Sequence, residues 1–122
     1  MTTEKKTLVL GASLNEERYS NQAIRALRRH GHAVVAVGLR EGLVLDAPIV
    51  KEIPAGTAVD TVTMYLNAHN QEPWEERILG LRPRRIIFNP GAENPAFARR
   101  AEAVGIITEE ACTLVLLGTE QY

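Results

Sequence analysis

Two short apolar runs, each followed by a glycine, constrain the fold of this chain more than any other feature of the sequence. Residues 7–10 lead into Gly11, and residues 32–37 lead into Gly38. Uninterrupted apolar runs of this length are typical of strands that are buried on both faces, as in a parallel sheet. A loop and a helical stretch separate the two runs. Together they predict a right-handed βαβ crossover of about thirty residues.

The stretch between the two runs carries the signals of a single helix. Ser20 can act as its N-cap, and Tyr19 before the cap can pack on Ile24 as a hydrophobic staple. Gly31 provides a stop in the left-handed conformation. The polar loop that begins at Ala12 therefore lies between the end of the first strand and the start of this helix.

The remainder of the chain repeats this alternation of strands and helices. Predicted strands cover residues 49–53, 59–66, 84–88 and 106–107, and predicted helices begin at Asn70 with Pro73, at Asn94 with Pro95, and within residues 108–118. We interpret residues 108–118 as a short buried helix, although residues 113–117 are apolar enough for a strand. The alternation predicts an α/β fold of three layers, with a mostly parallel sheet of about five strands and helices on both faces.

The expected order of the strands along the sheet is 3-2-1-4-5, numbered as they occur in the sequence. This order reverses between the strand at residues 7–10 and the strand at residues 59–66. Ligands of such sheets bind beyond the carboxyl ends of the strands, at the point of reversal. The predicted topology alone, without any motif, therefore places the candidate site at the loops that follow these two strands.

The size and charge of the chain limit what kind of protein it can be. With 122 residues, we expect a single domain over residues 1–122. Fourteen Lys and Arg against fifteen Asp and Glu give a net charge of -1, which argues against a nucleic-acid binder that works by bulk charge. The one cysteine, Cys112, excludes an internal disulfide and fits a reducing compartment. The sequence shows neither a secretory signal nor a membrane-length apolar stretch, so we expect a cytoplasmic protein with no membrane contact.

The loop after the first strand, residues 11–18, is a candidate anion site. Unpaired backbone amides at the start of a helix favour a bound phosphate, together with the positive end of the helix dipole. The dinucleotide fingerprint requires three glycines, but only Gly11 is present, and Ser13 and Glu16 occupy the other two positions. An NAD-type pyrophosphate site is therefore disfavoured, and an ordinary turn between strand and helix is the structural alternative.

Arg40 follows the second strand near the position where an NAD site usually places an acidic residue. A guanidinium there suits a phosphate on the ribose, whereas an exposed arginine considered alone is usually a solvated charge. Combined with the anion site at residues 11–18, Arg40 favours a phosphorylated adenosine ligand.

Short motifs along the chain resemble those of one protein family. They are Gly11-Ala12-Ser13 with Arg18-Tyr19-Ser20, then Asn89-Pro90-Gly91-Ala92-Glu93-Asn94, then Glu110-Ala111-Cys112. In order and spacing, these motifs resemble the small stand-alone CoA-binding proteins, whose fold is that of the N-terminal domain of the succinyl-CoA synthetase alpha subunit. The similarity extends from Thr7 to about Leu117. The chain departs from the family at Val37-Gly38-Leu39, where stand-alone members commonly read Val-Asn-Pro.

The resemblance implies a Rossmann-like domain that binds coenzyme A or an acyl-CoA. Residues 13–15 would lie along the phosphates, and Arg40 would stand where the synthetase domain uses a lysine. Residues 65–67 would border the adenosine or the pantetheine, and residues 89–91 would form the neighbouring rim. The predicted site residues are Gly11, Ala12, Ser13, Leu14, Asn15, Arg18, Ser20, Gly38, Leu39, Arg40, Tyr65, Leu66, Asn67, Asn89, Pro90 and Gly91.

Candidates for catalysis are poor. His30 and His32 lie on the side away from the expected site, and a lone histidine such as His69, near the rim, is more often solvated or capping. Cys112 lies in an apolar stretch, and we interpret it as a packing residue rather than a reactive thiol. Three arginines, Arg82, Arg84 and Arg85, are interpreted as a solvated charge group, because no interleaved aromatic residues suggest a nucleic-acid patch.

The sequence thus predicts a non-catalytic or accessory CoA-binding protein that needs no metal and binds neither nucleic acid nor membrane. Two alternatives are an NAD(P)-binding oxidoreductase-type domain and a regulatory domain that binds a partner without a small-molecule ligand. The apolar end of the chain, residues 113–117, also leads us to expect that a homodimer can form.

Overall fold

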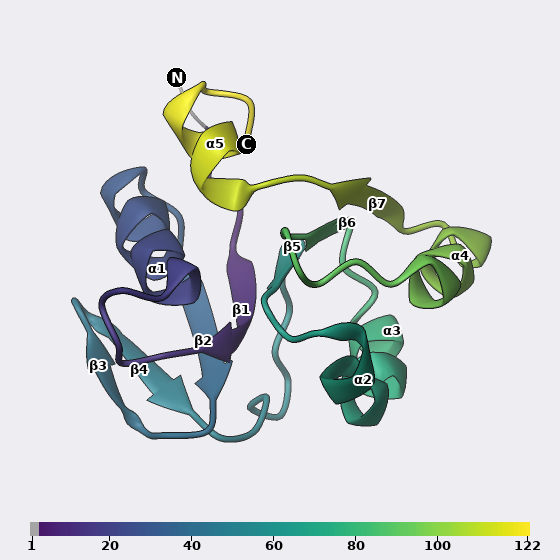
Figure 1. Ribbon diagram of the computed structural model, residues 1–122, viewed down its shortest axis with the longest axis horizontal. Helices are drawn as coiled ribbons and strands as arrows, with labels where there is room; N and C mark the ends of the chain where they lie inside the picture. The colour runs from purple at the N-terminus through teal and green to yellow at the C-terminus, as the bar shows by residue number, and fades with distance from the viewer. Residues whose placement is uncertain (1–2) are drawn as a thin grey trace.

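The first apolar run of the sequence forms a strand near the centre of the sheet, between two parallel neighbours (Figure 1). The computed structural model describes residues 3–122, so Met1 and Thr2, which the single-domain prediction included, lie outside the described residues. The elements are β1 (Thr7–Ala12), α1 (Tyr19–Arg29), β2 (Val34–Gly38), β3 (Gly42–Val44), β4 (Ala47–Val50), β5 (Thr61–Met64), α2 (Ala68–Gln71), the 3-10 helix η1 (Glu72–Trp74), α3 (Glu75–Leu81), β6 (Arg85–Phe88), α4 (Pro95–Ala103), β7 (Ile107–Glu110) and α5 (Thr113–Gly118).

Seven strands within residues 3–122 form one sheet, in the order β3-β4-β2-β1-β5-β6-β7. Neighbouring strands are parallel, apart from the antiparallel hairpin of β3 and β4. The predicted order of five strands is confirmed in β4, β2, β1, β5 and β6, and so is the reversal between β1 and β5. The α/β class is therefore confirmed, with a sheet that is larger than predicted.

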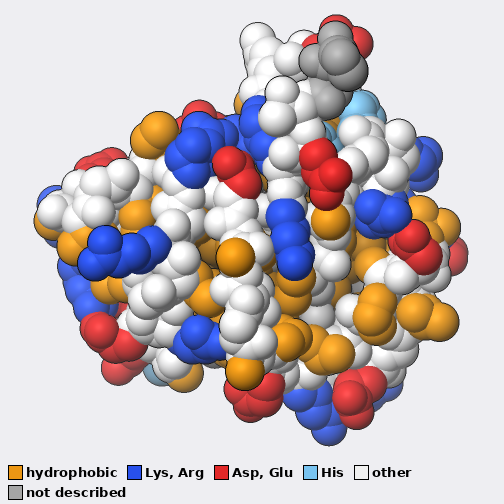
Figure 2. Space-filling model, turned by 180° about the vertical axis from the view of Figure 1, so that it is seen from behind, with side chains coloured by type: hydrophobic (Ala, Val, Ile, Leu, Met, Phe, Trp, Pro, Cys, Tyr) orange, Lys and Arg blue, Asp and Glu red, His pale blue; other side chains and the backbone are white. Residues whose placement is uncertain are grey.

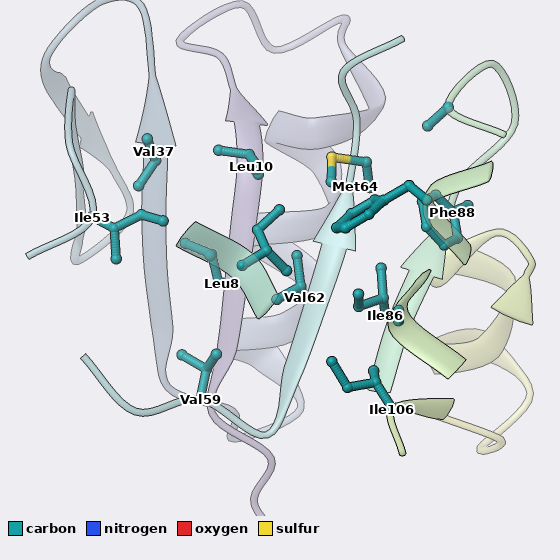
Figure 3. Packing of buried hydrophobic residues seen from close by; sticks show 14 residues of the cluster. Leu8, Leu10, Val37, Ile53, Val59, Val62, Met64, Ile86, Phe88 and Ile106 are labelled. Carbon is teal, nitrogen blue, oxygen red and sulfur yellow. The ribbon is translucent and has the colours of Figure 1, made fainter. Parts of the chain in front are cut away.

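Helices cover both faces of the sheet. Figure 1 shows α1 and α5 on one side, and α2, α3 and α4 on the other. Buried rows of side chains cross the strands beneath α3 and α4, one formed by Leu8, Val62 and Ile86 and the next by Leu10, Met64 and Phe88 (Figure 3). The opposite face packs Val9, Ile24, Leu27, Ile49 and Leu117 together. The structure thus confirms that β1 is buried on both faces, whereas Val34 and Val35 at the start of β2 are half-buried.

The two ends of the sheet differ from the prediction. Residues 42–50 form the β3–β4 hairpin, where at most one short strand at residues 49–53 was expected. At the other edge, the predicted strand at residues 106–107 overlaps only the first residue of β7, which runs from Ile107 to Glu110. The last helix is confirmed over residues 113–118, but it begins after β7 and not at Thr108.

The starts of the helices test the capping predictions. Asn94 is confirmed as a cap of α4, because its Oδ1 accepts a hydrogen bond from Phe97 N at 3.2 Å. The helix expected at Asn70 begins earlier, at Ala68, where Asn67 Oδ1 accepts from Asn70 N at 2.9 Å. Its path is divided into α2, η1 and α3.

The start of α1 also differs from the prediction. Arg18 occupies the N-cap position, and Ser20 is buried in the first turn of the helix. Tyr19 is 69% exposed and therefore does not form a staple with Ile24. The predicted stop at Gly31 is confirmed, since this residue has a φ of 83° directly after the C-cap His30.

Of the three arginines predicted to be solvated, Arg82 and Arg84 are exposed as predicted, and only Arg85 is not. Arg85 is buried, its Nε donates to Thr61 Oγ1 at 3.2 Å, and its guanidinium carbon lies 4.5 Å from the centre of the Tyr122 ring. Arg84 pairs with Asp60 at 3.0 Å. Thr7, Thr61 and Arg85 share one row of the sheet, so alternation along β6 turns Arg85 inward beneath the tail of the chain.

On the face shown in Figure 2, basic and acidic side chains are interspersed, and neither sign gathers into a stripe. Over residues 3–122, no helix combines the length and apolar character that crossing a membrane requires. The same residues contain no group of three or more His, Cys, Asp or Glu side chains placed to hold a metal ion.

Candidate functional site

Four neighbouring parallel strands bring the predicted site residues to one edge of the sheet. Following the order of the sheet, β2 leads into residues 39–41, β1 into residues 13–18, β5 into residues 65–67 and β6 into residues 89–94. The predicted residues lie in these loops or at the strand ends before them, apart from Ser20 in the first turn of α1. The structure therefore brings these segments together at the point of reversal, and their contact with a ligand stays a prediction.

A bulge shapes the end of β1. Leu10 pairs with Val37, whereas Ala12 pairs with Gly38, so that Gly11 is an extra residue with a φ of 97°. The bulge turns the Ala12 carbonyl group against Gly38. A Cβ atom on residue 38 would overlap the Ala12 carbonyl oxygen and lie 3.0 Å from its carbonyl carbon. The departure from the family pattern at Gly38 therefore has a steric cause.

The loops after β1 and β5 touch at the point of reversal. A Cβ atom on Gly11 would lie 3.2 Å from the backbone nitrogen of Leu66 and 3.2 Å from the carbonyl carbon of Tyr65. A side chain at position 11 would thus press on the β5 loop, and the positive φ opposes one as well. Gly11 allows these two backbones to approach each other closely.

The side chains of the β1–α1 loop are used mainly to fold the loop itself. Ser13 Oγ accepts from Asn15 N at 3.1 Å, and Asn15 Oδ1 accepts from Glu17 N at 2.9 Å. The buried Asn21 on α1 holds the same loop, because its Nδ2 donates to the Ser13 carbonyl oxygen at 2.9 Å. These local turns orient the backbone of the loop toward the start of α1.

The start of α1 supplies the amides of the predicted anion site. Asn21 N and Gln22 N both donate to the Arg18 carbonyl oxygen, at 3.1 and 3.2 Å. The backbone N–H groups of Tyr19 and Ser20 have no hydrogen-bond partner among the described residues. The first turn of this eleven-residue helix also contains no acidic residue. An anion at this position would meet free donors and the positive end of the helix dipole.

The tip of β2 is exposed and carries both apolar surface and charge. Leu39 is 92% exposed, and Arg40 next to it is exposed as well. Leu14 from the β1–α1 loop lies across Gly42, where a Cβ atom would come within 2.7 Å of Leu14 Cδ2. The tip of β2 thus carries an exposed arginine next in sequence to an exposed leucine, and Leu14 lies over Gly42 shortly beyond them.

Asn89 has its side chain turned away from the rim. Its Nδ2 donates to Thr63 Oγ1 at 2.7 Å and to the Met64 carbonyl oxygen at 2.9 Å, while its Oδ1 accepts from Thr113 N at 2.9 Å. Asn89 therefore fastens α5 to the sheet from a buried position. The exposed part of this predicted rim is formed by Pro90 and Gly91.

Tyr65 lies half-buried after β5, and its hydroxyl is buried without a hydrogen-bond partner among the described residues. Burial raises the pKa of Tyr65 to about 12, so the phenol is neutral at physiological pH. Cys112 lies nearby, half-buried at the N-cap of α5. The Tyr65 side chain therefore presents no charged group to the rim.

Comparison with known proteins identifies the family of the chain. A family model for the CoA binding domain matches residues 5–118 of the chain. The chain belongs to this family of CoA binding domains. The resemblance seen in the sequence motifs is confirmed, and the match spans every strand and helix of the structure.

Solved structures show the same fold. A crystal structure of an uncharacterised protein shares 41% identity with this CoA-binding-domain chain, with a TM-score of 0.94 over 99% of this chain and 100% of that chain. A protein from Thermus thermophilus shares 20% identity, with a TM-score of 0.84 over 97% and 91% of the two chains. A protein from Pyrococcus horikoshii also shares 20% identity, with a TM-score of 0.82 over 92% and 80%. A search of curated proteins gave no match.

Sequence reasoning missed the buried residues that shape the loops. Asn21 and Gln71 are polar residues in helices, and both are fully enclosed and hydrogen-bonded to loop carbonyl groups. Gly42 is missed because the β3 strand to which it belongs was not predicted. Polar residues inside a helix usually face solvent, so the pattern contained no signal for their burial.

Proposed function

We propose that this CoA-binding-domain protein binds coenzyme A, free or acylated, as a non-catalytic accessory protein. The observation that carries the proposal is the position of Arg40, exposed at the tip of β2 and next in the sheet to the strand whose loop leads to the free amides of α1. CoA carries a pyrophosphate and a separate phosphate on its ribose. One anion would lie at the start of α1, and the other would lie at Arg40.

The β1–α1 loop supports CoA over NAD. A pyrophosphate that lies close to the backbone requires glycines where this chain has Ser13 and Glu16. The Glu16 carboxylate is turned toward Arg25 on α1, at 3.2 Å. At the ribose position, Arg40 replaces the acidic residue that would bind the two hydroxyls of NAD.

The positions of the histidines and the cysteine support an accessory role. His32 lies at the amino end of β2, where its Nδ1 accepts from Lys5 N at 2.9 Å, on the side opposite the loops of the site. His69 is exposed on α2, and Cys112 is half-buried. The one thiol of the chain also supports a location in a reducing compartment such as the cytoplasm. The homodimer stays a prediction that sedimentation tests.

The proposal is tested by titrating CoA and dephospho-CoA against the wild-type protein and Arg40→Ala at fixed salt. A charge-assisted pair with the ribose phosphate corresponds to about ten- to a hundred-fold in affinity. We expect Arg40→Ala to bind CoA with an affinity that is lower by that factor and to bind dephospho-CoA as tightly as the wild type does. Arg29→Ala is the matched control, because Arg29 is exposed in the last turn of α1, away from the site.

Equal losses for the two ligands would show that Arg40 does not bind the ribose phosphate. A wild-type protein that binds NAD as tightly as CoA would favour the oxidoreductase-type alternative. A wild-type protein that binds neither would favour the regulatory domain without a small-molecule ligand.

A further inference from the structure

A buried carboxamide connects the loops after β5 and β6. Gln71, the last residue of α2, is fully buried. Its Nε2 donates to the Leu66 carbonyl oxygen at 2.9 Å and to the Ala92 carbonyl oxygen at 2.7 Å. Leu66 follows β5 and Ala92 follows β6, so one side-chain nitrogen joins two loops of the candidate site.

The oxygen of the same carboxamide extends the connection to a third segment. Gln71 Oε1 accepts from Asn94 Nδ2 at 2.9 Å, and Asn94 Oδ1 in turn accepts from Phe97 N in the first turn of α4. Both N–H groups and the oxygen of Gln71 are therefore engaged within the protein. Because Gln71 is also fully buried, it has neither a free polar atom nor exposed surface with which to contact a ligand.

The loops that Gln71 joins border the half of the site away from Arg40. The four strands that lead into the candidate site lie in the order β2-β1-β5-β6. Arg40 follows the strand at one end of this order, and Pro90 with Gly91 follows the strand at the other end. A ligand whose ribose phosphate lies at Arg40, and whose pyrophosphate lies at α1 after β1, extends from there toward β5 and β6. The remaining part of CoA is the pantetheine arm, so this arm would pass the loops that Gln71 holds.

We infer that Gln71 is a positioning residue for the pantetheine half of the CoA site. This inference rests on the proposed function. Gln71 acts through Leu66 and Ala92, whose separation it fixes, and thereby forms this half of the site before the ligand arrives. A site formed in advance binds more tightly, because ligand binding does not have to order the loops. Among the described residues, the hydrogen bonds of the Gln71 side chain go to Leu66, Ala92 and Asn94, and none reaches the tip of β2 at Leu39 and Arg40.

The test compares Gln71→Met with Asn70→Met. Methionine keeps the length of the side chain and the helix, but it removes the hydrogen bonds to Leu66, Ala92 and Asn94 and leaves those groups unpaired. Asn70 is the neighbouring carboxamide on α2, and it is exposed. The ligands are CoA and adenosine 3',5'-bisphosphate, which has the ribose phosphate but lacks the pantetheine arm.

We expect Gln71→Met to lose about tenfold in affinity for CoA and to bind adenosine 3',5'-bisphosphate within about twofold of the wild type. Asn70→Met should match the wild type for both ligands. Amide hydrogen exchange should become faster in residues 65–67 and 89–94 of Gln71→Met, while the core strands stay protected. A merely structural effect would weaken both ligands together.

If Gln71→Met fails to fold, Asn94→Ser serves as the second variant. Serine retains the cap of α4 but removes the bond to Gln71 Oε1, and we expect about a threefold loss for CoA alone. Equal losses for both ligands, or a Gln71 variant that behaves like Asn70→Met, would overturn the positioning role while CoA binding stands. A wild-type protein without affinity for CoA would overturn the proposed function and this inference with it.

Discussion

At the scale of single residues, Gly11 and Gly38 form one structural unit. The bulge at Gly11 changes the register of β1 against β2, and the Ala12 carbonyl group then occupies the space that a side chain at position 38 would need. The loop of the candidate site begins immediately after this bulge. Two glycines that are 27 positions apart in the sequence therefore set the path of the backbone at the rim.

This unit makes a stability prediction. Gly38→Ala should lower the free energy of unfolding by about 1–3 kcal/mol or more, because the new Cβ atom overlaps backbone that can move only by breaking the sheet. Urea denaturation measures the loss. Gly80→Ala in α3 is the control, since a Cβ atom there meets nothing within 4 Å among the described residues and should stabilise the helix by about 0.5–1 kcal/mol. If Gly38→Ala were as stable as the wild type, the bulged register would be wrong.

The roles of single residues could be predicted only in part from the sequence. The position of Arg40 at a strand tip follows from the apolar run that ends before it. The burial of Ser20 and the inward direction of Asn89 do not follow, because both depend on contacts across the fold. Asn89 occurs in a loop motif with proline and glycine, a context that is typical of exposed turns, yet both polar atoms of its side chain bond to β5 and α5.

At the scale of elements, local signals decided which predictions held. Helix α4 has both a capping asparagine and a proline in its first turn, and it begins as predicted. The β3–β4 hairpin has no such signal, because its turn places Leu45 at a φ of 54° instead of a glycine, and Pro48 lies within β4. This hairpin is stabilised by pairing with the sheet and by the burial of Val44 and Ile49. These contacts form only in the folded protein, so the local sequence does not indicate them.

Another feature at this scale is the meeting of two distant segments at the amino end of the sheet. The imidazole of His32 is buried, its Nδ1 accepts from Lys5 N at 2.9 Å, and its ring centre lies 5.0 Å from that of Tyr122. Tyr122 also bonds through its hydroxyl to Thr7 Oγ1 and through its carbonyl oxygen to Lys5 Nζ. Burial, followed by the charge of Lys5, holds the pKa of His32 below its ordinary value of 6.5.

This arrangement predicts a loss of stability in mild acid. The unfolded chain binds a proton at His32 as the pH falls through about 6.5, whereas the folded chain binds it only at a lower pH. Below about pH 6.5, protonation therefore stabilises the unfolded state relative to the folded state. Stability should fall by up to about 1.4 kcal/mol for each pH unit until the folded-state pKa is reached, and it should be unaffected by His32 above about pH 7.5. Urea denaturation between pH 7.5 and 5 measures the slope. His32→Asn should remove this part of the slope, whereas the exposed His69→Asn should retain it; a slope that both variants share would contradict the prediction.

At the scale of the whole molecule, the order of the strands determines where the candidate site lies. Alternating strands and helices fix a parallel sheet, and the reversal between β1 and β5 then selects one edge and four loops. For this reason the meeting of these loops at one edge could be predicted from the sequence, while the hydrogen bonds that hold them, such as those of Gln71, could not. The first depends on topology and the second on side-chain packing.

Ligand binding to this edge should stabilise the entire domain. A ligand that binds only the folded state, at a concentration one hundred times its dissociation constant, adds about 2.7 kcal/mol. For a domain of this size, that corresponds to a rise in Tm of roughly 8–15 °C.

We expect CoA to produce this rise in a concentration-dependent way and dephospho-CoA to need a higher concentration, because it lacks the phosphate for Arg40. NAD should produce little change, since the loop at Ser13 and Glu16 lacks the glycines that a dinucleotide requires. Equal shifts from NAD and CoA at matched concentrations would contradict the selectivity argued for the site, because the same free amides of α1 would then serve either pyrophosphate.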